Sequence, residues 1–255
     1  MDATLFTLPF TPATVAAAAA IILLAYTVFG LTGFGSSITA APFLVLLFPL
    51  RFAVPMMVIL DLVSATLLAL QNHRHVAWRE LARLFPYAAI GMLIGVTMLV
   101  HAPERPLLLL LALFVLGYLA KAVLGSPRTR DLASWWAAPL GTAGGIFTSL
   151  FGTGGPIYTI FMAGRLHDKS ALRATMGMLI LMTALVRVVL FTGTGFYAQP
   201  GLLLLSALLM PAVLIGLWLG SHLHQRLPTG RVVQAIQWVL LIGALNLIRR
   251  AVSGA

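Results

Sequence analysis

The sequence predicts an all-α polytopic membrane protein built as two inverted repeats, and three observations support this fold class. Apolar residues make up 60% of the 255-residue chain and charged residues only 9%, whereas about 25% of residues are charged in a soluble domain. The apolar residues fall in long runs, and motifs of the first half recur in the second. A soluble core has no use for so much apolar surface, so we expect the excess to face lipid.

Ten hydrophobic segments follow one another along the chain. Seven come close to the roughly 20 residues that a helix needs to cross the hydrocarbon core, and they cover residues 12–31, 52–70, 81–100, 107–124, 172–191, 201–219 and 232–248. Residues 36–48 and 156–162 are too short to cross without distortion, and residues 133–150 are broken by glycines. No basic leader precedes the first segment and no small-residue cleavage site follows it, which favours a retained helix over a signal peptide.

Positive charge is concentrated on one side of this arrangement. Placing the segments in order assigns one large group of basic residues to the same side: Arg74, Arg79, Arg83, Lys121, Arg128, Arg130, Arg165, Lys169, Arg173, Arg226 and Arg231. The opposite side receives a smaller group: Arg51, Arg105, Arg249 and Arg250. By the positive-inside rule, the first side is cytoplasmic and both termini lie outside. The formal charge of +10 therefore orients the protein and does not indicate a nucleic-acid partner.

The two halves share motifs in the same order. The pattern Pro-x4-Gly-x3-Gly begins at Pro86 and again at Pro211, 125 positions later. The turn Gly33-Phe-Gly-Ser36 corresponds to Gly152-Thr-Gly-Gly155. Each half carries five segments, and an odd number places the second half in the inverted orientation. The sequence therefore predicts an N-terminal membrane repeat over residues 1–125 and an inverted C-terminal membrane repeat over residues 132–255.

The glycine-rich turns, here called the first elbow (residues 31–37) and the second elbow (residues 148–156), leave two arrangements open. In each half, the first two segments form either a re-entrant or broken-helix hairpin or two full crossings. The shortness of the second segment favours the hairpin. The remaining paired glycines, Gly91 with Gly95 and Gly216 with Gly220, are predicted to be packing faces where small residues let helices approach closely.

Each elbow places glycine directly before a short helix, which we expect Ser36, Ser37 or Thr153 to cap. A helix that begins inside the membrane leaves backbone N–H groups unpaired and concentrates about half a positive charge there. Two such N-termini are expected to converge on a shared anion site near the midplane. The residues predicted to bind the anion at the elbows are Gly33, Gly35, Ser36, Ser37, Gly152, Thr153, Gly154 and Gly155. The alternative is that these glycines only allow helices to cross.

Asp61 and Arg187 lie well inside apolar segments that correspond in the two halves. A charge at such depth is costly unless it is paired or hydrated, so both residues are candidates for function. Arg187 is predicted to bind the anion through its fork of donors. Asp61 either carries a coupling proton or orients Arg187. Two further alternatives are a permanent Asp61–Arg187 ion pair that serves packing, and snorkelling of Arg187 to the membrane surface.

These motifs, taken together, resemble the sulfite exporter TauE/SafE family, also called the 4-toluenesulfonate uptake permease group. The resemblance covers nearly the whole chain. It rests on Gly33-Phe-Gly-Ser36 with Pro42 six residues later, on His75-Val-Ala-Trp-Arg-Glu80, on the helix that begins with Pro86, and on Phe151-Gly-Thr-Gly-Gly-Pro156. Many family members carry three glycines in the second elbow, and Thr153 replaces one of them here, which alters the shape or the donors of the site.

The resemblance implies a multi-pass transporter of the bacterial inner membrane that exports sulfite, sulfoacetate or related organosulfonates. We expect it to work by alternating access, with a small anionic substrate and the lipid bilayer as its partners. An anion channel and a proton-coupled uptake permease for organic anions are the nearest alternatives. A homodimer is left open.

Other functional classes find less support in the sequence. The chain has no cysteine, which excludes disulfides and thiol chemistry, and its histidines lack the spacing of a metal site. A hydrolase would need a base beside Ser36 or Ser37, and no histidine lies at membrane depth. We therefore expect no enzyme activity, no catalytic residue, no cofactor and no metal. An assembly or sensor protein is disfavoured because the loops are short.

Overall fold

The computed structural model describes residues 10–33, 35–72, 75–124, 131–223 and 240–249. These ranges are almost entirely helical and contain no strand, which confirms the predicted all-α class. The helices of the first half are α1 (Pro12–Thr32), α2 (Ser36–Leu47), α3 (Leu50–Asn72), α4 (Trp78–His101) and α5 (Glu104–Leu124). The second half contains η3 (Ser134–Trp136), α6 (Ala137–Phe151), α7 (Gly155–Ala163), α8 (Lys169–Gly193), η4 (Phe196–Ala198) and α9 (Leu202–Leu223). A C-terminal helix (Leu240–Arg249) follows.

Five of the described helices, α1, α3, α4, α8 and α9, are long and apolar enough to cross a membrane. Their outward faces carry large exposed apolar side chains such as Leu93, Val189 and Trp218, as expected for surfaces in contact with lipid. The segment predicted to be broken, residues 133–150, is instead one continuous helix from Ala137 to Phe151 after a single 3-10 turn. Its glycines serve close packing and do not interrupt it. The predicted segment 232–248 is described only from Leu240 onwards.

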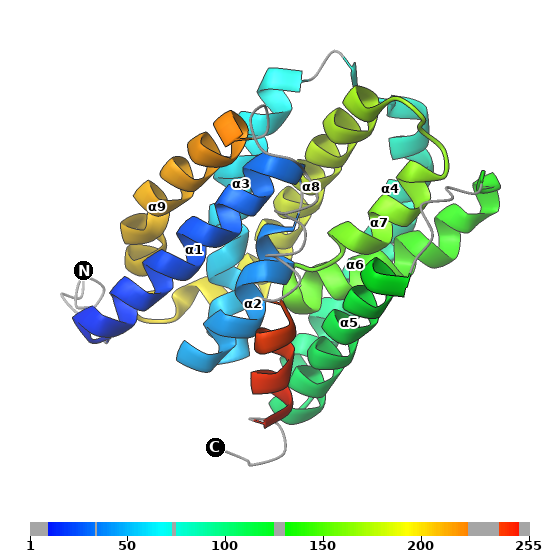
Figure 1. Cartoon of the computed structure of the whole chain (residues 1–255). Coiled ribbons are helices and arrows are strands. Elements are labelled where there is room, and N and C mark those ends of the chain that lie inside the picture. The colour runs from blue at the N-terminus through cyan, green and yellow to red at the C-terminus, as the bar shows by residue number, and fades with distance from the viewer. Residues whose placement is uncertain (1–9, 34, 73–74, 125–130, 224–239, 250–255) are drawn as a thin grey trace.

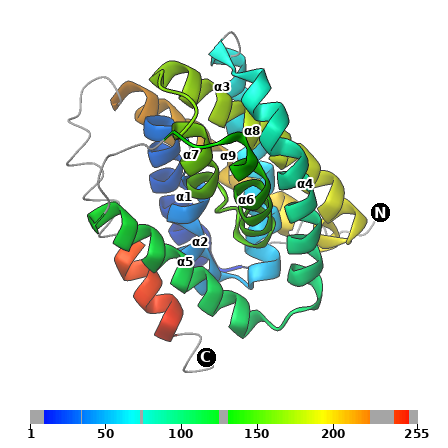
Figure 2. The same ribbon diagram turned by 90° about the vertical axis from the view of Figure 1, so that its right-hand side faces the viewer.

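The helices form a bundle with two close pairs on its flanks and a third pair between them (Figure 1). Helix α1 packs along α9, helix α4 packs along α6, and α3 packs along α8 in the middle. Figure 2 shows the bundle from the side, with the C-terminal helix next to α5. The same C-terminal helix reaches α2, because Gly243 lies against Pro42 and Phe43.

Paired glycines bring the flanking helices into backbone contact. A Cβ atom added to Gly30 of α1 would lie 3.0 Å from the Cα of Gly220 in α9, and one added to Gly91 of α4 would lie 3.0 Å from the Cα of Gly145 in α6. A Cβ atom added to Gly95 or to Gly216 would lie 2.6 Å from a backbone oxygen of the facing helix. The predicted role of these glycines as packing faces is therefore confirmed.

Hydrogen bonds identify the two ends of the bundle. At one end, here called the Glu80 end, Glu80 accepts hydrogen bonds from Arg83 at 2.7 Å and from Arg165 at 3.0 Å, and Arg165 also donates to the carbonyl of Leu132. These bonds to Glu80 raise the pKa of Arg165 above its ordinary value. At the other end, here called the Glu104 end, Glu104 accepts from the backbone N–H of Leu50.

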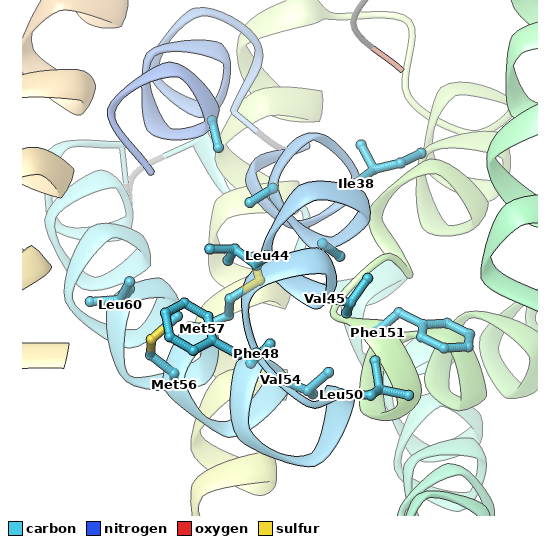
Figure 3. Close-up of a cluster of buried hydrophobic side chains, with 14 of the residues drawn as sticks. Ile38, Leu44, Val45, Phe48, Leu50, Val54, Met56, Met57, Leu60 and Phe151 are labelled. Carbon is cyan, nitrogen blue, oxygen red and sulfur yellow. The ribbon is translucent and has the colours of Figure 1, made fainter. Parts of the chain in front are cut away.

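The main apolar core packs the short helix α2 against α3 and the end of α6. Figure 3 shows Leu44, Val45 and Phe48 directed at Met57 and Phe151. Phe48 stacks on Phe52 at 5.4 Å, and Phe10, just before α1, packs edge-on against both rings. Residue 48 directly follows α2, so α1 begins and α2 ends near the start of α3, at the Glu104 end.

Candidate functional site

Both elbows turn through glycines that adopt left-handed backbone conformations. In the first elbow, φ is +80° at Gly33 and +96° at Gly35, and in the second it is +74° at Gly152. L-residues with a Cβ atom rarely adopt such angles. Each elbow therefore reverses the chain sharply and starts a short helix, α2 of 12 residues or α7 of 9 residues.

The prediction that Ser36, Ser37 or Thr153 caps these helices is wrong. The N-cap residues are Gly35 and Gly154, and neither helix has a side-chain cap. The serine hydroxyls instead donate to the carboxylate of Asp61, and charge-assisted bonds of this kind are stronger than bonds between neutral groups. Pro156 does lie in the first turn of α7, as expected. Both helix N-termini are thus left without a side-chain partner.

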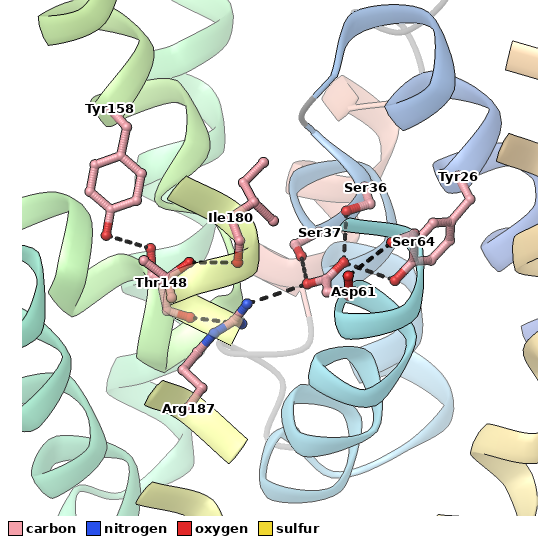
Figure 4. Close-up of polar contacts among 10 residues, drawn as sticks. Tyr26, Ser36, Ser37, Asp61, Ser64, Thr148, Tyr158, Ile180 and Arg187 are labelled. Atoms are coloured by element: carbon pink, nitrogen blue, oxygen red, sulfur yellow. Dashed lines mark hydrogen bonds and ion pairs between the residues drawn. The ribbon is translucent and has the colours of Figure 1, made fainter. Parts of the chain in front are cut away.

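Asp61, in the middle of α3, is held by hydroxyl groups of the first half (Figure 4). Its Oδ1 accepts from Tyr26 at 2.8 Å and from Ser36 at 3.0 Å, and its Oδ2 accepts from Ser37 at 3.2 Å. Only 2% of the residue is exposed. Ser64, one turn along α3, donates to the backbone carbonyl of Asp61. The carboxylate is therefore well solvated by protein groups although it lies deep in the bundle.

Arg187 of α8 reaches the same place from the second half, and it is held more weakly. Its guanidinium lies 3.5 Å from Asp61 Oδ2 and donates to the carbonyl of Thr148 at 3.3 Å. Its Nε atom is buried and has no hydrogen-bond partner. These contacts exclude snorkelling, since the head group lies inside the bundle with 2% of the residue exposed. They also show that Arg187 and Asp61 form an ion pair, a point that the sequence left open.

A small cavity lies where the two elbows meet. Its volume is about 20 Å³, enough for one or two waters. It is lined by Gly35, Ser36, Ser37, Ile38, Asp61, Thr148, Gly152, Thr153, Gly155, Pro156, Tyr158, Ile180, Thr183 and Arg187. Most of the predicted anion-site residues are therefore brought together.

Two predicted residues do not line this cavity. Gly33 packs beside the side chain of Arg173 at the end of α1, where Arg173 donates to the carbonyl of Gly30. Gly154 is enclosed by Thr148 and Tyr158, so it supports the turn from behind. Both glycines shape the elbows without facing the cavity.

Several residues of the site were missed by sequence reasoning. Tyr26, Thr148, Tyr158 and Thr183 lie in apolar runs where a single hydroxyl carries little signal. A buried tyrosine hydroxyl nevertheless requires a partner, and both tyrosines have one. Tyr26 donates to Asp61, and the hydroxyls of Thr148 and Tyr158 are bonded at 3.0 Å.

Some polar groups of the cavity have hydrogen-bond partners and others have none. The hydroxyl of Thr153 is buried without a partner, with 1% of the residue exposed. Thr153 lies in the second elbow, directly before the N-terminus of α7. The Nε atom of Arg187, which also lines the cavity, is likewise buried without a partner. A buried donor without a partner is costly, and here several are gathered around one cavity. These groups are a cation, a hydroxyl and a helix N-terminus, and all three suit the binding of an anion.

Comparison with known proteins adds to this picture. The profile of the family described as "Sulfite exporter TauE/SafE" matches residues 18–247, nearly the whole chain. The chain belongs to this family. It is also 24% identical over 193 residues to the "Probable inner membrane transporter protein TsaS" of Comamonas testosteroni, a match that covers 75% of this chain and 81% of that protein. No solved structure matches the chain.

Membership of the TauE/SafE family, together with the five long apolar helices, makes the chain a multi-pass membrane transporter for sulfur-containing anions. The family and the TsaS protein are transporters and not enzymes. In the described part of the chain, the cavity between the elbows surrounds a buried cation, Arg187, with polar groups that suit an anion.

Proposed function

We propose that the protein exports sulfite, sulfoacetate or a related organosulfonate across the bacterial inner membrane by alternating access. The anion occupies the cavity between the elbows, where Arg187 and Thr153 donate hydrogen bonds to its oxygens. The inner-membrane location is carried over from the TsaS relative. The observation that carries this proposal is that two residues with unpartnered buried atoms, Arg187 (Nε) and Thr153 (Oγ1), line one cavity. The starts of α2 and α7, which have no side-chain cap, lie at the same cavity.

The proposed carrier consists of two inverted repeats, residues 1–125 and 132–255. The helix contacts support this arrangement, because α1 packs on α9 as its counterpart α6 packs on α4, and α3 packs on its own counterpart α8.

We also propose that α1–α2 and α6–α7 are re-entrant hairpins. Helices α2 and α7 contain 12 and 9 residues, which is about half of the length that crosses a bilayer. Arg165 follows α7 and bonds Glu80, so α7 points to the Glu80 end while α2 points to the Glu104 end.

The Glu80 end is proposed to face the cytoplasm. Arg79, Arg83, Arg165 and Arg173 lie at this end, and basic residues are concentrated on cytoplasmic surfaces. Because the chain lacks cysteine, single cysteines test this orientation directly. In intact cells, Asp131→Cys is expected to resist a membrane-impermeant thiol reagent and His101→Cys to react with it. The reverse pattern would contradict the proposed orientation.

Export follows from the electrical driving force. A membrane potential that is negative inside favours exit of an anion by about 2.3 kcal/mol per charge per 100 mV. Export therefore needs no coupling ion, whereas uptake would.

Flux from proteoliposomes tests the proposal. Vesicles are loaded with sulfite or sulfoacetate, with phosphate and acetate as comparison anions, and the internal potential is set with a potassium gradient and valinomycin. We expect efflux of a sulfur oxyanion that saturates with concentration and accelerates when the interior is negative. Efflux that does not saturate would indicate a channel. Absence of flux for both sulfur anions would contradict the proposed substrates.

A further inference from the structure

The two charges in the cavity depend on each other unequally. Asp61 has three hydroxyl donors at 2.8–3.2 Å, from Tyr26, Ser36 and Ser37. Arg187 has five N–H donors to place, and its contacts are Thr148 O at 3.3 Å and Asp61 at 3.5 Å. If the pair separates, Asp61 keeps its hydroxyl donors. Arg187 keeps a single carbonyl and loses the charge that balances it.

The ion pair is also a contact between the two halves of the chain. The donors to Asp61 come from α1 and α2, whereas Thr148, the other partner of Arg187, belongs to α6. Among the described residues that line the cavity, Asp61 and Arg187 are the charged ones. The side chains are 3% and 2% exposed respectively. Both charges are therefore shielded from bulk solvent, and a lone charge in the membrane interior is unfavourable.

The space between the charges is too small for a substrate in this conformation. The cavity volume is about 20 Å³, which suits one or two waters but neither the four heavy atoms of sulfite nor a larger organosulfonate. Ser37 and Gly152 close the same space from opposite sides, since a Cβ atom on Gly152 would lie 2.5 Å from Ser37 Oγ. An anion that binds Arg187 must therefore separate it from Asp61 and move the elbows apart.

The net charge of the site differs between its two states. In the empty site, Asp61 and Arg187 cancel. When an anion binds, Arg187 balances one negative charge, and the other negative charges of Asp61 and the anion leave the site with a net negative charge. A membrane potential acts only on charge that moves through it. It therefore drives the loaded site outward and does not oppose the return of the empty, neutral site.

We propose that Asp61 is a built-in substitute for the substrate, which takes the place of the anion on Arg187 when the site is empty and allows the empty carrier to return. This inference rests on the proposed function, because it takes the cavity to carry the anion. Arg187 alternates between two negative partners, the substrate on the outward step and Asp61 on the return step. The hydroxyls of Tyr26, Ser36 and Ser37 keep the carboxylate in position throughout.

The substitution Asp61→Asn tests this role, because two transport modes differ in their need for the empty carrier. Net efflux of sulfite requires an empty return step in every cycle. Exchange of internal for external sulfite does not, since the carrier is loaded in both directions. Because a neutral amide cannot balance Arg187, net efflux is expected to fall by about tenfold or more, a change that corresponds to at least ~1.4 kcal/mol in the return barrier. Exchange of radiolabelled sulfite is expected to stay within about threefold of wild type.

Three comparisons make the result decisive. Asp61→Glu keeps the charge and is expected to retain net efflux. Thr66→Val, on the same helix but outside the cavity, where its hydroxyl donates to the carbonyl of Leu62, is expected to leave both modes unchanged. Stabilisation of purified Asp61→Asn protein by sulfite against heat, at least as large as in wild type, shows that the variant is folded and binds. Equal loss of net efflux and exchange in the Asp61→Asn variant, or retention of both, would overturn the inference.

The unaltered protein provides a second test that does not depend on a variant. Net sulfite efflux is expected to carry negative charge outward and to respond to membrane potential, while sulfite exchange is not. Efflux that ignores the potential and follows a pH gradient would mean that the charge of the loaded site does not drive the outward step, which overturns the inference. Wild-type vesicles that show neither efflux nor exchange would overturn the proposed function, and this inference with it.

Discussion

The two elbows have similar glycine-rich turns, but their polar groups are in opposite states. In the first elbow, the hydroxyls of Ser36 and Ser37 are both bonded to Asp61. In the second elbow, the hydroxyl of Thr153 has no partner, and neither does Nε of Arg187 beside it. The first elbow therefore stabilises a fixed negative charge, and the second presents open donors. A pseudo-symmetric scaffold thus holds an asymmetric site, in which we expect an incoming anion to bind to the second elbow.

The elbows also differ in the space around their glycines. A Cβ atom on Gly35 would have its nearest neighbours at 3.7 and 3.8 Å, an ordinary contact distance. A Cβ atom on Gly152 would lie 2.5 Å from Ser37 Oγ and 3.5 Å from a terminal nitrogen of Arg187. The second elbow is thus the tightly fitted one, although it carries the open donors.

The largest difference is predicted between Gly152→Ala and Gly35→Ala. Both place alanine at positive φ, at a cost of about 1–2 kcal/mol. Only Gly152→Ala also collides with Ser37, which bonds Asp61 across the cavity, so we expect it to abolish sulfite transport and to lower the thermal unfolding midpoint further. Unfolding in detergent and flux in vesicles measure both effects. Equal effects of the two substitutions would mean that the elbows are not packed differently.

Thr153→Val is predicted to have the next largest effect, on binding alone. Removing one hydrogen bond to a charged ligand costs about 1.5–3 kcal/mol, so the affinity for sulfite should fall by about tenfold or more. Stability should be unchanged or slightly higher, because an unpaired buried hydroxyl is removed. Ser149→Ala is the matched control: Ser149 Oγ is also buried without a partner, but the residue does not line the cavity. If Thr153→Val binds sulfite like wild type, Thr153 is not a ligand.

Ser36→Ala is predicted to have the smallest effect on binding and a modest effect on stability. Loss of a hydrogen bond to Asp61 should destabilise the protein by about 1.5–3 kcal/mol, while sulfite affinity changes by less than about threefold. Titration of sulfite into the purified variant gives the affinity. An affinity loss as large as that of Thr153→Val would remove the distinction between the two elbows.

The sequence predicted the helices and most of the residues that gather around the cavity because both depend on local signals. Apolar runs of membrane length, glycines before short helices, and charges such as Asp61 and Arg187 inside apolar segments are visible without any tertiary information. Whether those two charges touch depends on how α3 and α8 pack, which no local pattern specifies. The structure resolves that point as an ion pair.

The errors have a common physical origin. Ser36 and Ser37 were assigned to helix capping because a serine at a helix start normally caps it. Both hydroxyls instead donate to the carboxylate of Asp61, 25 and 24 positions away, in charge-assisted bonds that no local pattern reveals. Tyr26 was missed for the same reason, since its partner is also Asp61. Glycines in a helical run predict a break by their low helix propensity, but in α6 Gly141 and Gly145 serve the contact with α4 and the helix is continuous.

The central claim, that an anion binds Arg187 between the elbows, is tested most directly by ligand-dependent thermal stabilisation of the purified protein. Sulfite, sulfoacetate, taurine, sulfate, phosphate and acetate are compared on wild type, Arg187→Ala and Arg173→Ala. Arg173 is the control because it lies on the same helix but outside the cavity. A ligand at about 100 times its Kd stabilises the folded state by ~2.7 kcal/mol. We predict selective stabilisation by a sulfur oxyanion in wild type and Arg173→Ala, and none in Arg187→Ala. Selective stabilisation that persists in Arg187→Ala would contradict the account.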